Sequence, residues 1–257
     1  MKIQKFRSDP PDRQGQVRSR METLLGKDAL DEINDTWVLI VGAGVGGTYV
    51  AYDLARKGYN LKICDGDVVR PANLGTQKYG EKDLGENKAI VAARNSTERT
   101  SLPVEAIGIP YMFDEAVKEK IDLNVDVVVA FTDSFLSRFE VSEYFYQKRP
   151  VISAGLGESG TWGWTFVQEP GEACLRCCFP KVDLNKTAGC TGLTGDSAKL
   201  TSSLVTYGVD TLVLDHKFRK RDWNYRKVDL SGFSASPDEL NQVEKKEGCE
   251  LCGSIKE

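Results

Sequence analysis

The chain has 257 residues and a formal net charge of −4, with a sequence pI of about 5.3. This mild acidity gives no sign of the broad positive surface used to bind nucleic acid. No apolar run approaches the roughly 18 residues of a membrane span, and the polar N-terminus lacks a secretory signal. We therefore expect a cytoplasmic protein without a nucleic-acid or membrane partner.

The cysteine and histidine content narrows the chemistry. Seven cysteines, an odd number, argue against a disulfide framework in an intracellular protein. The single histidine, His216, lies in a basic segment and is expected at the surface. Catalysis that depends on histidine is therefore not expected.

The N-terminal segment is polar up to about residue 20 and contains Pro10 and Pro11, a composition typical of a disordered leader. A helical pattern over Gln16–Leu30 then leads to the first strand.

The first strong motif follows a short apolar run, Val38–Val41, which is typical of a parallel strand buried on both faces. The sequence GAGVGG over residues 42–47 comes next and fits G-x-G-x-x-G. A helical segment, Thr48–Lys57, and a second apolar strand, Leu61–Cys64, lead to Asp65. Strand, glycines, helix, strand and acid in this order predict a nucleotide site.

Each part of this motif has a physical role. The glycines let backbone approach phosphate, the following helix points free N–H groups at it, and Asp65 is placed to accept hydrogen bonds from ribose hydroxyls. The alternative is a glycine turn that only lets helix and strand pack. The backbone groups expected to contact the nucleotide belong to Gly42, Gly44, Val45, Gly46 and Gly47.

The remaining pattern alternates strands and helices as far as residue 155 and then changes. Further strands are expected at 104–107, 125–131 and 150–154, and helices at 135–147 and at 85–97, the latter opened by residues 85–88. After that come a strand at 162–166, a helix at 197–214, one or two strands within 223–233 and an exposed polar stretch at 234–246. The expected fold is α/β: a Rossmann-like, doubly wound, mostly parallel sheet with an antiparallel C-terminal extension.

Two C-x-x-C pairs form the second strong signal. Cys174 with Cys177, and Cys249 with Cys252, can together supply four thiolates to one tetrahedral ion, which favours a structural Zn²⁺. One pair alone could instead be a redox dithiol. Cys190 lies apart in a glycine-rich loop, where a nearby helix N-terminus can lower a thiol pKa, although an ordinary small residue is the alternative.

Acidic and basic residues follow the ends of several expected strands. Asp65, Asp67, Lys88 and Asp133 with Ser134 all fall at the edge of the sheet where open parallel sheets bind ligands. A lysine beside carboxylates suits phosphates with Mg²⁺, and so favours adenylyl or phosphoryl chemistry over hydride transfer.

The ordered set of motifs resembles the superfamily of ThiF, molybdopterin-synthase adenylyltransferases and ubiquitin-activating enzymes. The motifs are GAGVGG, D-G-D (Asp65, Asp67), N-L-x-x-Q (Asn73, Gln77), G-x-x-K (Gly85, Lys88), T-D-S with a following arginine (Asp133, Arg138), C-x-x-C (Cys174, Cys177), Cys190, and G-C-E-L-C-G (Cys249, Cys252). The resemblance covers nearly the whole chain. It implies an N-terminal arm over 1–30 and one adenylation domain over 31–257, with a nucleotide-binding half at 36–155 and a half at 156–257 that carries the crossover loop and the zinc.

The resemblance also implies an activity. Such an enzyme uses ATP and Mg²⁺ to adenylate the C-terminal glycine of a small β-grasp protein, either ubiquitin-like or a sulfur carrier ending in Gly-Gly. Carried over, Asp65 would hold the ribose, Asn73 and Lys88 the phosphates, and Asp133 the Mg²⁺. Cys190 matches a loop cysteine that accepts the acyl group in some members.

Partners follow from the same resemblance. Members are commonly homodimers in which an N-terminal arginine reaches the partner's ATP, and Arg18 or Arg20 lies in the matching region. A conjugating enzyme or sulfur donor would be a separate protein.

Thr76 departs from the family pattern, because it stands where N-L-x-R-Q has an arginine. Losing a donor to the triphosphate weakens transition-state stabilisation. Arg70, Lys78 or the N-terminal arginines are candidate substitutes. Two alternatives to the adenylating enzyme therefore stay open: a nucleotide-binding scaffold without turnover, and an NAD(P)-dependent oxidoreductase.

Overall fold

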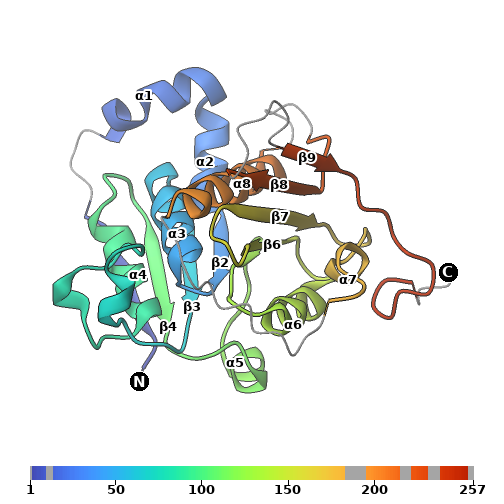
Figure 1. Ribbon diagram of the computed structural model, residues 1–257. Helices are drawn as coiled ribbons and strands as arrows, with labels where there is room; N and C mark the ends of the chain where they lie inside the picture. The colour runs from blue at the N-terminus through green and yellow to red at the C-terminus, as the bar shows by residue number, and fades with distance from the viewer. Residues whose placement is uncertain (1, 10–13, 183–194, 215–220, 231–237, 254–257) are drawn as a thin grey trace.

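The computed structural model describes residues 2–9, 14–182, 195–214, 221–230 and 238–253. Cys190 and His216, singled out above, lie outside these ranges. The described strands form one nine-stranded sheet with the order β1-β4-β3-β2-β5-β6-β7-β8-β9 (Figure 1). None of the described helices combines the length and the apolar character needed to cross a membrane.

The centre of the sheet is parallel, and its apolar runs are buried on both faces as expected. Its strands are β4 (Glu105–Ile109), β3 (Asn60–Cys64), β2 (Trp37–Val41), β5 (Val127–Ala130) and β6 (Val151–Leu156). The parallel part of the sheet starts at β2, adds β3 and β4 on one side, and then continues with β5 on the other side. This reversal between β2 and β5 is the topological switch point where α/β sheets bind ligands.

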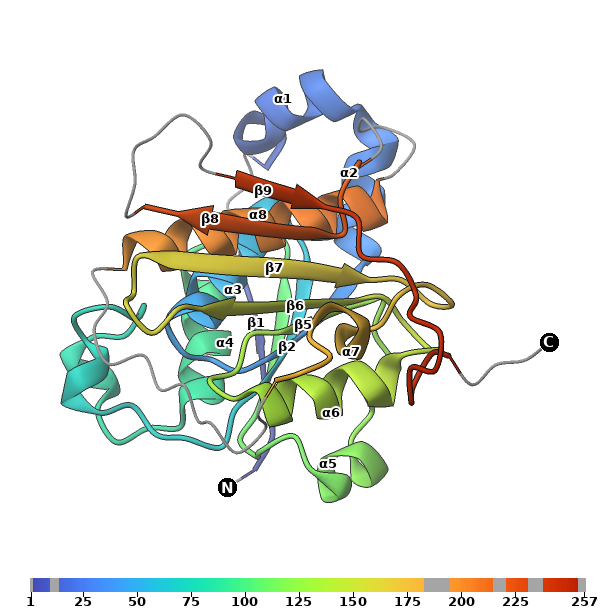
Figure 2. The ribbon, with the colours of Figure 1, turned by 45° about the vertical axis from the view of Figure 1, so that its right-hand side comes forward.

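Helices cover both faces of the sheet, which confirms the doubly wound fold class. One face packs against α2 (Lys27–Asp35), α3 (Val45–Lys57), α4 (Lys88–Glu98) and α8 (Asp196–Val213), and the other against α5 (Glu115–Lys120) and α6 (Phe135–Phe145). Figure 2 shows α6 and α8 on opposite sides of strands β6 to β9. Two 3₁₀ turns, Pro71–Asn73 and Glu81–Asp83, and the short helix α7 (Leu175–Cys178) lie in connections.

The antiparallel extension consists of β7 (Trp162–Gln168), β8 (Tyr225–Asp229) and β9 (Asp238–Asn241). The prediction of one or two strands after Trp223 is met by β8 in the described residues. The stretch 234–246 was predicted to be polar and exposed, and within it Asp238–Asn241 form a strand that the backbone ladder to β8 holds in place. Residues 242–246 that follow are exposed except for Val243.

The N-terminal prediction also needs correction. Residues expected in a disordered leader form β1 (Gln4–Arg7), which pairs antiparallel with β4, and Lys5 Nζ lies 2.6 Å from a carboxylate oxygen of Glu105. The helix predicted at 16–30 is divided into α1 (Gln14–Leu25) and α2 by Gly26, whose φ of +83° is left-handed. Pairing with a strand 100 residues away leaves no local pattern in the sequence.

Candidate functional site

A cleft of about 820 Å³ opens at the carboxyl ends of β2, β3, β5 and β6, beside the switch point. Its walls include most of the nucleotide-site residues that the sequence indicated. Among them are Gly42, Gly44, Val45, Gly46, Asp65, Asp67, Asn73, Thr76, Lys88, Asp133 and Ser134. Segments as far apart in the chain as Val41 and Leu156 therefore meet in one site, although Gly47 is not on its wall.

The four glycines of the loop divide into different structural roles. Gly42 has a left-handed φ of +97°, and its N–H donates to the Cys64 carbonyl at 2.9 Å. A Cβ at Gly44 would meet no atom within 4 Å, so this backbone faces open cleft. This is the position at which phosphate can approach the chain.

The other two glycines serve packing. Helix α3 begins at Val45 rather than at Thr48, and so includes Gly46 and Gly47 in its first turn. A Cβ at Gly47 would lie 1.9 Å from the Gly42 carbonyl oxygen, and one at Gly46 would lie 2.2 Å from the Phe131 ring. Gly46 and Gly47 thus allow the helix to pack closely, which is the alternative role considered for this glycine motif, while Gly44 faces the space where a ligand can bind.

Asp65 anchors the glycine loop to the end of β3. Its Oδ2 accepts the Ala43 N–H at 2.7 Å and its Oδ1 accepts the Asp67 N–H at 2.8 Å. Burial raises the pKa of Asp65, while these two backbone bonds and Lys88 act in the opposite direction. Each carboxylate oxygen can accept a second hydrogen bond, so the side chain keeps capacity for a ribose hydroxyl.

Lys88 is held at the cleft by its neighbours. Its Nζ lies 2.8 Å from Asp67 Oδ2, and its backbone N–H donates to the Asp67 carbonyl at 2.8 Å. Asn87 caps α4 through the Ile90 N–H and also donates to the carbonyls of Asp65 and Asp67. One asparagine therefore fixes the helix that carries the lysine to the turn that carries the acids.

The loop between β3 and α4 forms another wall. Asn73 Oδ1 accepts the Arg70 N–H at 2.8 Å and closes the 3₁₀ turn, and Thr76 lies on the cleft wall. Among the candidate substitutes for an arginine at 76, Arg70 is exposed and does not line the cleft. Lys78 Nζ lies 4.2 Å from the ring centroid of Tyr49 and 5.5 Å from that of Tyr52, and Lys78 does not line the cleft.

An ion cluster around the buried carboxylate of Asp83 holds this loop against α4. Both outer nitrogens of the Arg94 guanidinium bond Glu86, at 2.8 and 2.9 Å, and one of them also bonds Asp83 Oδ1 at 2.8 Å. Asp83 is completely buried and its Oδ2 accepts the Gly80 N–H. No pattern in the sequence predicts this cluster.

The end of β5 supplies the opposite wall. Asp133 is exposed at the cleft, and Ser134 caps α6 by accepting the Ser137 N–H at 3.1 Å. Arg138, in the first turn of α6, is buried and lines the same wall. Arg138 was noted as part of a motif but not predicted as a site residue, and neither were Met112 and Phe113, which also line the cleft.

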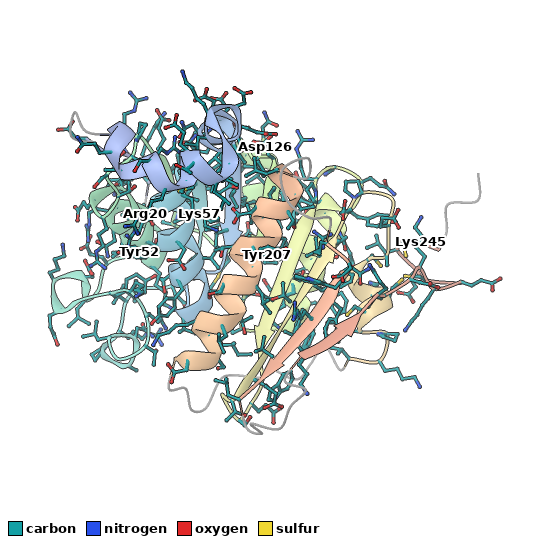
Figure 3. All side chains as sticks on the ribbon, turned by 90° about the horizontal axis from the view of Figure 1, so that it is seen from above. Arg20, Tyr52, Lys57, Asp126, Tyr207 and Lys245 are labelled. Carbon is teal, nitrogen blue, oxygen red and sulfur yellow. The ribbon has the colours of Figure 1, made fainter. Side chains whose placement is uncertain are left out.

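The two N-terminal arginines are separated by the structure. Arg18 is buried, and its guanidinium donates to Asn34 Oδ1 and to the Lys57 carbonyl, both at 2.9 Å, at the end of α3 remote from the glycine loop. Burial lowers the pKa of Arg18 from its usual value. Arg20 is exposed on α1 (Figure 3). A cation that reaches a second subunit is therefore compatible with Arg20 and not with Arg18.

The four paired cysteines come together away from the cleft. Their sulfur atoms lie within 4.8 Å of one another, with Cys174–Cys249 at 3.5 Å and Cys177–Cys252 at 3.2 Å. A Zn–S distance of about 2.3 Å in a tetrahedron corresponds to S–S edges of roughly 3.8 Å, so the donor set and spacing fit zinc. The two C-x-x-C segments are carried by α7 and by the turn at the C-terminal end.

Comparison with solved structures identifies the fold. The chain aligns with E. coli MccB in complex with AMPCPP and MccA with a TM-score of 0.75 and 18% identity, covering 96% of this chain and 76% of that one. It aligns with PaaA with a TM-score of 0.70 and 17% identity, covering 92% and 75%. At these identities the likeness concerns the fold.

This chain also resembles two curated proteins in sequence, but it covers a smaller share of their length. The "ATP-dependent ubiquitin transferase-like protein Cap2" of E. coli is 25% identical over an alignment 272 positions long, which covers 93% of this chain and 45% of that protein. The uncharacterized protein MT1398 of Mycobacterium tuberculosis is 27% identical over 155 residues, 59% of this chain and 21% of that protein. The chain thus spans less than half the length of these curated relatives.

The family assignment rests on the match to a family model. The model of the ThiF family matches residues 17–251, from helix α1 to the residue before Cys252. The cleft motifs, the first cysteine pair and Cys249 fall inside it, and the chain belongs to the ThiF family.

Proposed function

We propose that this protein uses ATP to adenylate the C-terminal carboxylate of a peptide or small protein. One observation carries the proposal: a single cleft is lined by the open glycine Gly44, the lysine Lys88 and the acids Asp65 and Asp133. This set suits a nucleoside triphosphate and a divalent cation better than a nicotinamide, which needs no lysine at its phosphates.

Each residue has a role in this proposal. Asp65 accepts the ribose hydroxyls, Asn73 and Lys88 bind phosphate oxygens, and the N–H groups at the start of α3 face the same phosphates. Asp133 and Asp67 offer carboxylate oxygens to Mg²⁺, which would neutralise charge on the triphosphate. Lys88 moves from Asp67 to phosphate when the nucleotide enters.

The reaction needs positioning more than proton transfer. A carboxylate oxygen attacks the α-phosphorus of ATP, a new O–P bond forms, and the bond to the β-phosphate oxygen breaks to release pyrophosphate. The attacking carboxylate is already ionised near neutral pH, so no general base is required. The protein holds two anionic reactants together and compensates their charge.

The known relatives support this activity class. Structures of E. coli MccB have been solved with ATP and with MccA, and the relative Cap2 is described as an ATP-dependent ubiquitin transferase-like protein. Both a peptide and a β-grasp protein ending in Gly-Gly are therefore candidate substrates. We further propose that Cys190 accepts the acyl group as a thioester and that a separate conjugating enzyme or sulfur donor consumes it.

Two features complete the proposal. The four cysteines hold a structural Zn²⁺, since four thiolates leave no open coordination position for catalysis. A homodimer in which Arg20 reaches the partner's nucleotide would add the positive charge that Thr76 lacks.

The test is ATP–pyrophosphate exchange with a β-grasp protein ending in Gly-Gly and with synthetic peptides that have a free C-terminus. The same peptides with a C-terminal amide are the matched control, because an amide cannot form the acyl-adenylate. Exchange that requires the free carboxylate supports adenylation. ATP binding without exchange would favour the scaffold alternative, and nicotinamide binding without ATP binding would favour the oxidoreductase.

A second comparison addresses Cys190. A thiol-sensitive covalent adduct in the wild type that is absent in Cys190→Ala, with exchange retained in both, would support acyl transfer to this cysteine. Exchange in both without an adduct would contradict it.

A further inference from the structure

Arg138 places a positive charge in a buried position near the N-terminus of a helix, and both features of this position are unfavourable for a cation. It lies in the first turn of α6, whose first residue is Phe135, and its side chain is only 5% exposed. The N-terminus of a helix carries partial positive charge, so a cation in the first turn is disfavoured. Burial adds a desolvation cost. A residue kept in such a position despite both costs suits an anionic ligand.

The guanidinium is held in a fixed orientation. One of its outer nitrogens donates to the Thr132 carbonyl. Its central carbon lies 5.0 Å from the ring centroid of Phe135 and 5.4 Å from that of Trp164, and these two rings stack at 5.7 Å with an angle of 10°. Such aromatic contacts orient the planar fork of donors, which matches a carboxylate in geometry.

The position of Arg138 along the sheet edge separates it from Asp65 and from the glycine loop. The order of strands places Asp65 at β3, the glycine loop at β2, Asp133 after β5 and Leu156 at β6. A nucleotide with its ribose on Asp65 and its phosphates over the glycine loop leaves the β5–β6 end of the cleft to the second reactant. Arg138 lines the cleft at that end, on the helix that follows β5.

We propose that Arg138 binds the carboxylate of the acyl substrate and, after adenylation, the acyl carbonyl oxygen. This inference rests on the proposed adenylation and names the residue that receives its second substrate. A guanidinium there offsets the repulsion between the incoming carboxylate and the α-phosphate, and aligns the attacking oxygen. It does not replace the arginine that is missing at Thr76, because it serves the acyl group and not the triphosphate.

The experiment uses two stable probes that differ only in the acyl group. These are 5′-O-sulfamoyladenosine and 5′-O-(N-glycylsulfamoyl)adenosine, which mimics a glycyl-adenylate. Dissociation constants for both probes and for ATP are measured by calorimetry on the full chain. The variants are Arg138→Met, Arg138→Lys, and Arg149→Met as a control. Arg149 also donates to a backbone carbonyl, that of Val125, but does not line the cleft.

We expect the wild type to prefer the glycyl probe. In Arg138→Met this preference should fall by about 10-fold to 100-fold, the effect of one charge-assisted contact, while ATP affinity stays within about twofold. Arg138→Lys should lose part of the preference, because it keeps the charge without the planar fork. Arg149→Met should behave as the wild type.

Two results would overturn the proposal. One is a wild type that binds ATP but shows no preference for the glycyl probe. This result is obtained without any variant, so it does not depend on whether a variant folds. The other is an Arg138→Lys or Arg138→Met variant that loses ATP affinity as strongly as glycyl-probe affinity, which would assign the arginine to the nucleotide. A wild type that binds neither ATP nor sulfamoyladenosine would instead contradict the proposed function itself.

Discussion

Removing the Arg94 side chain should cost the protein a large share of its stability. Arg94→Ala leaves Asp83 charged, 0% exposed and without its guanidinium partner. Loss of one partner of a buried ion pair costs roughly 3–5 kcal/mol, and we expect the lower end because the Arg94 side chain itself is 24% exposed. Glu86, at 41% exposed, should contribute less than about 1 kcal/mol.

The assay is urea unfolding at 25 °C, with a thermal scan in parallel. A loss of roughly 3 kcal/mol should lower the midpoint urea concentration at unchanged slope, and lower Tm by about 6–12 °C in a chain of this size. The matched control is Lys82→Ala. Lys82 pairs with Glu98 at 3.8 Å, but both side chains are more than half exposed, so the expected change is below about 0.5 kcal/mol.

The acid dependence gives a second, independent readout. The hydrogen bond from Arg94 lowers the pKa of Glu86. A depressed carboxyl pKa contributes stability above the unfolded-state value of about 4.3, and that contribution is lost as the pH falls through the folded-state pKa. The stability gap between wild type and Arg94→Ala should therefore narrow in acid. The reasoning is refuted if Arg94→Ala costs no more than Lys82→Ala at neutral pH.

Three further predictions concern the cleft and the cysteines. Gly47→Ala should destabilise the fold by roughly 2 kcal/mol or more, because the added Cβ would clash with the Gly42 carbonyl. Gly44→Ala should leave Tm unchanged in thermal scans and weaken ATP binding. Equal effects of the two substitutions on Tm would contradict this. Lys88→Met should lower ATP affinity by about 10-fold to 100-fold in calorimetry, and equal losses in Lys78→Met would argue against a specific phosphate contact. Cys249→Ser should lose the bound zinc measured by elemental analysis, while Cys178→Ser should retain one ion per chain.

The parallel half of the molecule was accessible to sequence reasoning because its signals are local. A strand buried on both faces is a continuous apolar run, as at Val38–Val41, and parallel strands bring their carboxyl ends to one edge. The sequence alone therefore predicts that the acids and the lysine that follow those runs lie at a common site. The sequence likewise predicts one site for the four cysteines, because a tetrahedral ion has four coordination positions and each cysteine supplies one thiolate.

The features that sequence reasoning missed depend on distant partners. Strand β1 exists because it pairs with β4 and its basic side chains meet Glu105, and β9 exists because it pairs with β8. Arg94 and Arg138 look like ordinary helical arginines until Asp83 and the Phe135–Trp164 stack are brought beside them. The different roles of Gly44, Gly46 and Gly47 likewise become visible only when the Phe131 ring and the Gly42 carbonyl are in place.

The spacing of the cysteine pairs along the sequence affects the conformational entropy of the unfolded chain. Cys174 and Cys249 are separated by 75 residues, as are Cys177 and Cys252. An ion held by all four would close a ring containing α8, β8 and β9, and would limit the conformations of that ring in the unfolded chain. For a cross-link of this length the chain-entropy effect is about 4 kcal/mol, comparable with the net stability of many domains. Nearly a third of the chain would then be restrained by four sulfur atoms, at the end of the sheet that has the most polar strands.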